Sequence, residues 1–156
     1  MKITIVVIGK TSAPYLREGI DLYLKRLSFY CKYSLMELPD FGQKGILPTD
    51  LKKREGELIL KNIKPDDLLV LCDERGEQFT SREFSVFLQR KMNSGVKNMT
   101  VVIGGAFGFS DELYARAQHQ ISFSKMTFSH EMIRLILCEQ LYRAFTILKG
   151  ESYHHD

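Results

Sequence analysis

Residues 101–108 read VVIGGAFG and residues 121–128 read ISFSKMTF, and these two stretches decide the fold. Each opens with apolar residues typical of a buried strand and then changes to glycine or hydroxyl residues. In α/β proteins the carboxyl ends of neighbouring parallel strands form the crevice in which ligands bind. The two stretches therefore predict a ligand site built where two strands end.

Strands and helices are predicted to alternate along the rest of the chain, because short apolar runs are separated by segments of helical periodicity. The predicted strands cover residues 2–8, 33–38, 68–72, 99–103 and 119–123, and the predicted helices cover 13–30, 49–62, 81–92, 110–117 and 129–149. This alternation is typical of a mainly parallel sheet with helices on both faces. We therefore predict an α/β fold with a single domain over residues 1–156.

Hydroxyl and acidic residues stand where these helices are expected to begin. Thr49 or Asp50, Ser81, Ser110 and Ser129 are the predicted N-caps, since their side chains can accept a hydrogen bond from the first helical turn.

Composition excludes several classes of protein. The 156 residues are 44% hydrophobic and 26% charged, as in an ordinary globular protein, and no apolar run approaches the roughly 20 residues that cross a bilayer. The first ten residues lack the pattern of a signal peptide, so we expect a cytoplasmic protein without membrane contact. His130 and Glu131 are followed by Arg134 where a zinc-protease helix needs a second histidine, and the three cysteines have no metal-ligand spacing. No metal is expected.

The last predicted helix is apolar around most of its circumference. Only Glu139, Gln140 and Arg143 share a polar arc. A helix of this kind must be buried on more than one side. Its own sheet covers one side, and a second copy of the chain is expected to cover another, which predicts a homodimer. Burial within one chain is the alternative.

The glycine stretch and the hydroxyl stretch each have a plain structural explanation as well. Residues 104–108 match neither GxGxxG nor the P-loop, and a tight turn alone would account for their glycines. Residues 122–128 would also suit a buried strand that leads into a capped helix.

Taken together, the motifs resemble the knotted SPOUT-class methyltransferases, and most closely the ribosomal RNA large subunit methyltransferase H family. The resemblance covers essentially the whole chain. It rests on KITIxxxGK at the amino terminus, YxKRL at 23–27, VIGGxxG at 102–108, SFSKMTFxHxMxR at 122–134, EQxYRAF at 139–145 and GExYH at 150–154. Ser129 and Ser152 depart from the residues usual in the family.

The resemblance implies a carboxyl-terminal trefoil knot and a pocket for S-adenosyl-L-methionine. By motif position the residues that hold this cofactor are Leu71, Cys72, Gly104, Gly105, Phe123, Ser124, Lys125, Met126, Thr127 and Phe128. Backbone groups are expected to read the adenine, and phenylalanine and methionine side chains to enclose it. A branched side chain at Gly105 is expected to stand where the cofactor approaches the backbone.

The family's reaction is methylation of N3 of a pseudouridine in 23S ribosomal RNA. A protonated imide nitrogen is a poor nucleophile, so the proton must leave, and His154 is the expected base or base-positioning group. Tyr153 is expected to stack on the target base, and Arg143 and Glu139 to contact phosphate or position the tail. The alternatives are a frayed, solvated tail and a simple surface ion pair. His130 is assigned either to the cofactor loop or to the start of the helix.

The expected partner is ribosomal RNA in the large subunit or the whole ribosome, because the chain has no separate RNA-binding domain. Two alternatives stay open. One is a related SPOUT methyltransferase acting on another ribosomal or transfer RNA uridine, and the other is a non-catalytic RNA-binding assembly factor.

Overall fold

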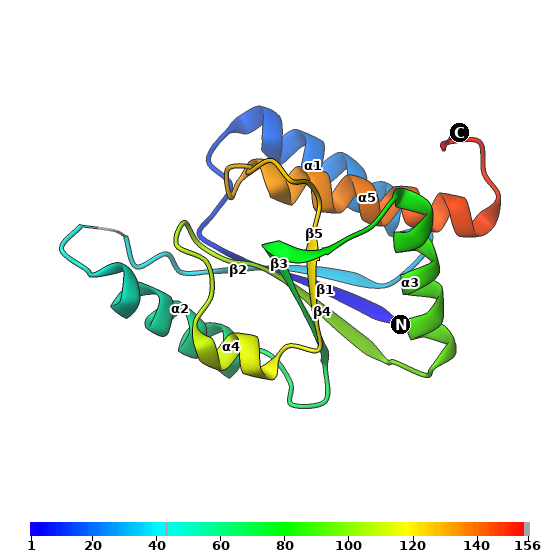
Figure 1. Cartoon of the computed structure of the whole chain (residues 1–156). Coiled ribbons are helices and arrows are strands. Elements are labelled where there is room, and N and C mark those ends of the chain that lie inside the picture. The colour runs from blue at the N-terminus through cyan, green and yellow to red at the C-terminus, as the bar shows by residue number, and fades with distance from the viewer. Residues whose placement is uncertain (43, 155–156) are drawn as a thin grey trace.

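Five parallel strands form one sheet with helices on both faces in the computed structural model, which describes residues 1–42 and 44–154 (Figure 1). In chain order the elements are β1 (Lys2–Ile8), α1 (Pro14–Leu27), β2 (Tyr33–Leu38), α2 (Pro48–Asn62), β3 (Leu68–Gln78), α3 (Ser81–Asn93), β4 (Asn98–Ile103), α4 (Asp111–Arg116), β5 (His119–Ser122) and α5 (Met132–Lys149). The strand order is β2-β1-β4-β3-β5, and every neighbouring pair is parallel. The predicted α/β fold with a parallel sheet is confirmed.

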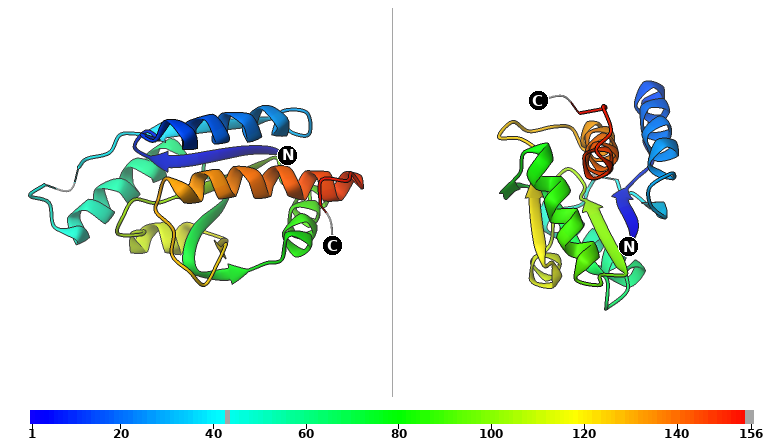
Figure 2. Two further views of the ribbon diagram at one scale, coloured as in Figure 1. Left: turned by 90° about the horizontal axis from the view of Figure 1, so that it is seen from above. Right: turned by 90° about the vertical axis from the view of Figure 1, so that its right-hand side faces the viewer.

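The sheet has a hydrophobic core on each face, because successive side chains of a strand point to opposite sides. Ile3, Ile5 and Val7 of β1 pack in the core beneath α1, α3 and α5, whereas Val6 and Ile8 pack in the core beneath α2 and α4. Figure 2 shows these layers from two further directions. Within the described residues, none of the helices combines the length and apolarity needed to cross a membrane.

Two predicted helix caps are wrong by one to three residues. α2 begins at Pro48 with Leu47 as its N-cap, because a proline suits the first helical position and needs no capped N–H. α3 is capped by Thr80, which forms a capping box with Glu83, instead of by Ser81.

The other two predicted caps hold in part. Ser110 caps α4 as expected, through a 3.4 Å hydrogen bond from the N–H of Leu113. Ser129 accepts a 3.2 Å hydrogen bond from the N–H of Met132, but it caps a turn that comes before α5, and the helix proper starts at Met132.

β3 is longer than predicted and changes its register against β5 between Cys72 and Glu77. Gly76 makes this possible, since a Cβ atom there would lie 2.5 Å from the backbone nitrogen of Ile121. The irregular stretch carries residues 73–75 out of the regular ladder at the edge of the sheet where β4 and β5 end.

α5 packs between α1 and α3 on one face of the sheet. Its approach to α1 is close, because a Cβ atom at Gly19 would lie 2.9 Å from Cδ1 of Leu135. The residues from Met132 to Leu148 are all at least partly buried. Two neighbours in the same chain thus cover much of the apolar surface that the sequence analysis assigned to a partner.

A buried arginine fixes the start of α5. The Arg134 side chain is 2% exposed and donates hydrogen bonds to the carbonyl oxygens of Ile8 at 2.6 Å and Gly9 at 3.0 Å. Beside it, the Glu131 carboxylate accepts hydrogen bonds from the backbone N–H groups of Ser12 at 3.0 Å and Ala13 at 3.2 Å. The beginning of α5 is therefore tied to the segment that joins β1 to α1.

Candidate active site

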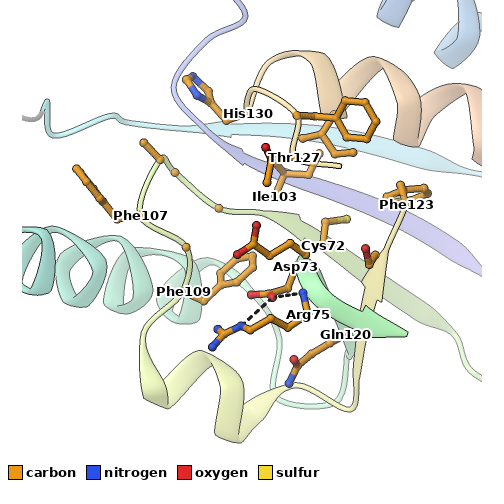
Figure 3. Close-up of a pocket in the computed structure, with 18 of the residues that line it drawn as sticks. Cys72, Asp73, Arg75, Ile103, Phe107, Phe109, Gln120, Phe123, Thr127 and His130 are labelled. Atoms are coloured by element: carbon orange, nitrogen blue, oxygen red, sulfur yellow. Dashed lines mark hydrogen bonds and ion pairs between the residues drawn. The ribbon is translucent and has the colours of Figure 1, made fainter. Parts of the chain in front are cut away.

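A cavity of about 940 Å³ lies at the edge of the sheet where β4 and β5 end (Figure 3). Three separate stretches line it: residues 72–75, residues 103–109, and most of residues 120–130. The two stretches 101–108 and 121–128 therefore meet at one site, as predicted. The cavity has the size of a small-molecule site.

Most of the predicted cofactor residues line this cavity. They are Cys72, Gly104, Gly105, Phe123, Ser124, Met126, Thr127 and Phe128. Leu71 does not line it, because its side chain points to the opposite face of β3 and is fully buried in the core beneath α2 and α4. Lys125 is exposed and does not line it either.

The glycine loop, residues 104–108, is a tight turn that also borders the cavity. Its role as a turn and its predicted role at a ligand site are therefore compatible. The N–H of Gly108 donates to the carbonyl oxygen of Gly105 at 3.3 Å, and Gly108 has a φ of 79°. A Cβ atom at Gly104 would lie 3.0 Å from the Phe109 ring, and one at Gly105 would lie 2.6 Å from a carboxylate oxygen of Glu55. A side chain at Gly105 would thus meet Glu55, and its predicted clash with the cofactor stays a prediction.

Hydroxyl groups form hydrogen bonds within the second loop at the cavity, residues 122–128. Ser122 Oγ donates to the carbonyl oxygen of Ser124 at 2.8 Å, and Ser124 Oγ accepts the N–H of Met126 at 2.8 Å. The loop holds Met126 with 77% of its surface exposed and Phe128 half exposed, both at the cavity. Apolar side chains at such an edge can cover a flat ring.

Cys72 lines the cavity without being reactive. Burial raises the pKa of its thiol to about 12, with further contributions from Cys138 and Asp73. The thiol therefore stays protonated and fills space instead of acting as a nucleophile.

A polar group that the sequence analysis missed lies opposite the glycine loop. The Tyr114 hydroxyl donates to the Asp73 carboxylate, and the Arg75 guanidinium donates to both Tyr114 and Asp73. Burial alone would raise the pKa of Asp73, but these hydrogen bonds outweigh it and lower the pKa. The signal for the group was the run of charged residues directly after the apolar part of β3.

The predicted tail residues form a second cluster, held by side chains. Glu139 accepts hydrogen bonds from Arg143 Nε at 2.9 Å and from the Tyr153 hydroxyl at 3.1 Å. The Tyr153 ring stacks edge-on against Tyr142 with centroids 4.7 Å apart, and the Arg143 guanidinium lies 4.9 Å from its centroid. Burial and the hydrogen bond with Tyr23 raise the pKa of Tyr153. The described part of the tail is therefore packed against α5 and is not frayed.

The His154 ring is oriented by Arg143. Arg143 Nη1 lies 3.3 Å from Nδ1 of His154, and a guanidinium can only donate. Nδ1 is therefore the acceptor in this contact.

The two clusters do not meet within one chain. The cavity touches α5 at Ile133, in its first turn, whereas Arg143 comes ten residues later, about 15 Å along the helix axis. Figures 1 and 2 show the tail at the far end of α5 from the loop that precedes the helix. His130 belongs to the cavity cluster, and its carbonyl oxygen accepts a hydrogen bond from Arg134. Both roles expected for it, at the cofactor loop and at the start of the helix, are thus compatible with its position.

The described residues contain no cluster of histidine, cysteine and carboxylate side chains suited to a metal ion.

Comparison with known proteins gives consistent findings. Residues 1–154 match the family described as "Predicted SPOUT methyltransferase". A protein of Flavobacterium psychrophilum named "Ribosomal RNA large subunit methyltransferase H" is 53% identical, over 99% of both chains, and one of Parabacteroides distasonis with the same name is 50% identical over 100% of both. Among solved structures, a tRNA (m1G37) methyltransferase from Aquifex aeolicus aligns with a TM-score of 0.58 at 13% identity, over 100% of this chain and 76% of that one. A probable methylase family protein from Haemophilus influenzae aligns with a TM-score of 0.55 at 15% identity, over 99% and 70%. These two likenesses concern the fold.

Proposed function

The chain belongs to the SPOUT methyltransferases and, among them, to the ribosomal RNA large subunit methyltransferase H family, and from this we propose that it methylates N3 of a pseudouridine in 23S ribosomal RNA. The observation that carries the proposal is the cavity between the glycine loop and the 122–128 loop. Family membership alone leaves room for an inactive relative, and an intact cavity favours an enzyme over that alternative.

The residues at the cavity fit S-adenosylmethionine, the methyl donor of this family. Main-chain groups of Gly104 and of the 122–128 loop offer hydrogen bonds to an adenine edge. Phe123, Met126 and Ile133 offer apolar surface. When bound, the cofactor supplies an electrophilic methyl group on a sulfonium.

The residues of the tail are suited to the acceptor base. Glu139 holds Arg143 and Tyr153, and Arg143 Nη1 lies 3.3 Å from Nδ1 of His154. Donors of this cluster can bind a carbonyl oxygen of the base and stabilise the negative charge that N3 carries once its proton has left. We therefore assign His154 to base positioning or proton removal.

The separation of the two clusters supports a homodimer. One chain holds the donor cavity and the acceptor cluster about 15 Å apart along α5, whereas methyl transfer needs the reacting atoms about 3–3.5 Å apart. A second copy that placed its tail over the cavity would remove this gap. The exposed side of α1 offers a surface for it, with Tyr15 66% exposed and Leu22 45% exposed around a shallow groove at Gly19.

Complementation between two inactive variants tests this arrangement. Gly105→Val disables the cavity and His154→Ala disables the tail, and mixed dimers of the two can be isolated with two different affinity tags. If each site combines one cavity with the partner's tail, the mixed dimer has one intact site and about half the wild-type activity. If each site lies within one chain, the mixed dimer is as inactive as its parents.

Methyl incorporation distinguishes the candidate substrates. Radiolabelled cofactor should methylate whole ribosomes or large subunits from a strain that lacks this activity, and nucleoside mass spectrometry should identify 3-methylpseudouridine. Labelling of another uridine or of transfer RNA would support the related-methyltransferase alternative. Absence of labelling despite cofactor binding would support the assembly factor.

Three further features belong to the same proposal. The two hydrophobic cores share one sheet, which supports a single domain. The trefoil knot implied by the family stays a prediction, and the burial of Arg134 against the end of β1 is compatible with a chain threaded there. Ribosomes as substrate would be consistent with the expected cytoplasmic location.

A further inference from the structure

Glu55 is a buried carboxylate directly behind the glycine loop. It lies on α2, is 5% exposed, and does not itself line the cavity. The Gly105 backbone lies against it, since a Cβ atom at Gly105 would lie 2.6 Å from one carboxylate oxygen and 2.7 Å from the other, and the Gly105 N–H lowers the pKa of the carboxyl. Since Gly105 lines the cavity, a single layer of backbone separates the carboxylate from the site.

The packing around Glu55 holds the loop in register with α2. The next residue on the helix, Gly56, faces Ser110, and a Cβ atom at Gly56 would lie 2.3 Å from Ser110 Oγ. Glu55 and Gly56 therefore contact the two ends of the 105–110 loop. A helix position used only for packing would suit an apolar residue, because burial of a carboxylate has an energetic cost.

We propose that Glu55 is a buried counter-charge that positions Gly105 and favours the positively charged methyl donor over the uncharged-sulfur product. The inference rests on the proposed function. S-adenosylmethionine carries a net positive charge through its sulfonium. S-adenosylhomocysteine, the product that remains after methyl transfer, lacks this charge. A fixed negative charge behind the loop attracts the donor more than the product. Such a preference helps product to leave after each turnover.

The protonation of Glu55 gives the inference a pH signature. Burial, with a smaller contribution from the charge of Asp40, raises the pKa of its carboxyl to about 7, and the backbone N–H of Gly105 opposes this rise. A cation bound nearby favours the ionised form, so the donor binds more tightly as pH rises through neutrality.

Other charged groups surround the site. Asp40 comes from the segment before α2, Lys52 from α2 itself and Asp111 from α4, while Arg134 on α5 interacts electrostatically with Asp40. His130 also lines the cavity, so a variant at Glu55 is needed to separate the contributions.

The test is calorimetric titration of the full chain with S-adenosylmethionine and with S-adenosylhomocysteine at about pH 6 and about pH 8. Wild-type protein should bind the donor about tenfold more tightly at the higher pH, and the product should change by less than about twofold. Glu55→Gln keeps the shape and a hydrogen-bond acceptor but should lose both the pH effect and about tenfold of the preference for donor over product. Glu57→Gln, at an exposed position on the same helix, should behave as wild type.

Each contrary result has a distinct meaning. Equal loss of donor and product affinity in Glu55→Gln would reduce Glu55 to a structural support and overturn the counter-charge. If Glu55→Gln does not fold, the wild-type titrations decide, because equal pH dependence for donor and product rejects the inference by itself. Failure of wild-type protein and Glu57→Gln to bind the donor at either pH would instead reject the proposed function.

Discussion

The two ends of α5 are built in different ways. At the first turn, the cavity is formed mainly by backbone turns at glycine and serine, and its apolar side chains are partly exposed. At the last turns, Glu139, Arg143, Tyr153 and His154 are joined by side-chain contacts. The donor region therefore depends on the course of the main chain, whereas the acceptor region depends on particular functional groups. Substitutions at the first turn of α5 should therefore lower cofactor affinity, whereas substitutions at its last turns should lower the methylation rate.

The largest effect is expected from Gly105→Val. The new side chain would collide with the Glu55 carboxylate and displace the loop, so affinity for S-adenosylmethionine should fall by about 100-fold or more. Calorimetry measures it, and circular dichroism checks the fold. Glu57→Gln, at an exposed position outside the cavity, is the control. Near-normal affinity in Gly105→Val would mean that the donor region does not depend on this turn.

The next effect tests the other end of the helix. His154→Ala should lower the methylation rate by about 10²-fold while leaving cofactor affinity within about twofold, since His154 lies outside the cavity of its own chain. Single-turnover kinetics on ribosomes and cofactor titration give the two numbers. Ser152→Ala, exposed in the same tail, serves as control. An equal loss of cofactor affinity in His154→Ala would contradict the proposal that donor binding and acceptor positioning lie at opposite ends of α5.

The smallest effect concerns stability at the start of α5. Hydrogen bonds from the Ser12 hydroxyl and backbone lower the pKa of Glu131 to about 2, below its usual value of about 4.3. A lowered pKa means that the stabilisation is present above pH of about 4.3 and is lost as pH falls towards 2. Glu131→Gln should therefore unfold more readily than wild type near neutrality, by about 1 kcal/mol or less because the site is exposed, and the difference should shrink in acid. Urea titrations at several pH values measure this, and a difference that does not change with pH would contradict it.

The strands were predictable because their apolar runs are short, dense and ended by glycine, proline or charge. Residues 2–8 and 33–38 match β1 and β2 at both ends. The end of β3 was not predictable, since its irregular part is charged and depends on Gly76 passing close to β5. The shifts at the starts of α2 and α3 came from choosing between adjacent residues that can each begin a helix.

The site was predictable as a set of segments and not as a geometry. The glycine and hydroxyl stretches meet because both end parallel strands, which a pattern reveals. The side chain of Leu71 does not line the cavity because strand alternation sends it to the other face, and the role of Leu71 in holding the cofactor stays a prediction. Glu55 gave no signal, since an acidic residue on a polar helix is ordinarily solvated, and only the approach of Gly105 makes it unusual.

Because Arg134 fixes the start of α5, the length of this helix sets the distance between the cavity and the tail cluster. Its guanidinium pins one end of the helix to the carbonyl groups of Ile8 and Gly9, and the rise per residue then sets where the tail begins. One residue inserted in the middle would carry the tail about 1.5 Å further and turn it through about 100°. The number of helical residues after Arg134 thus determines where the tail lies and which way it faces.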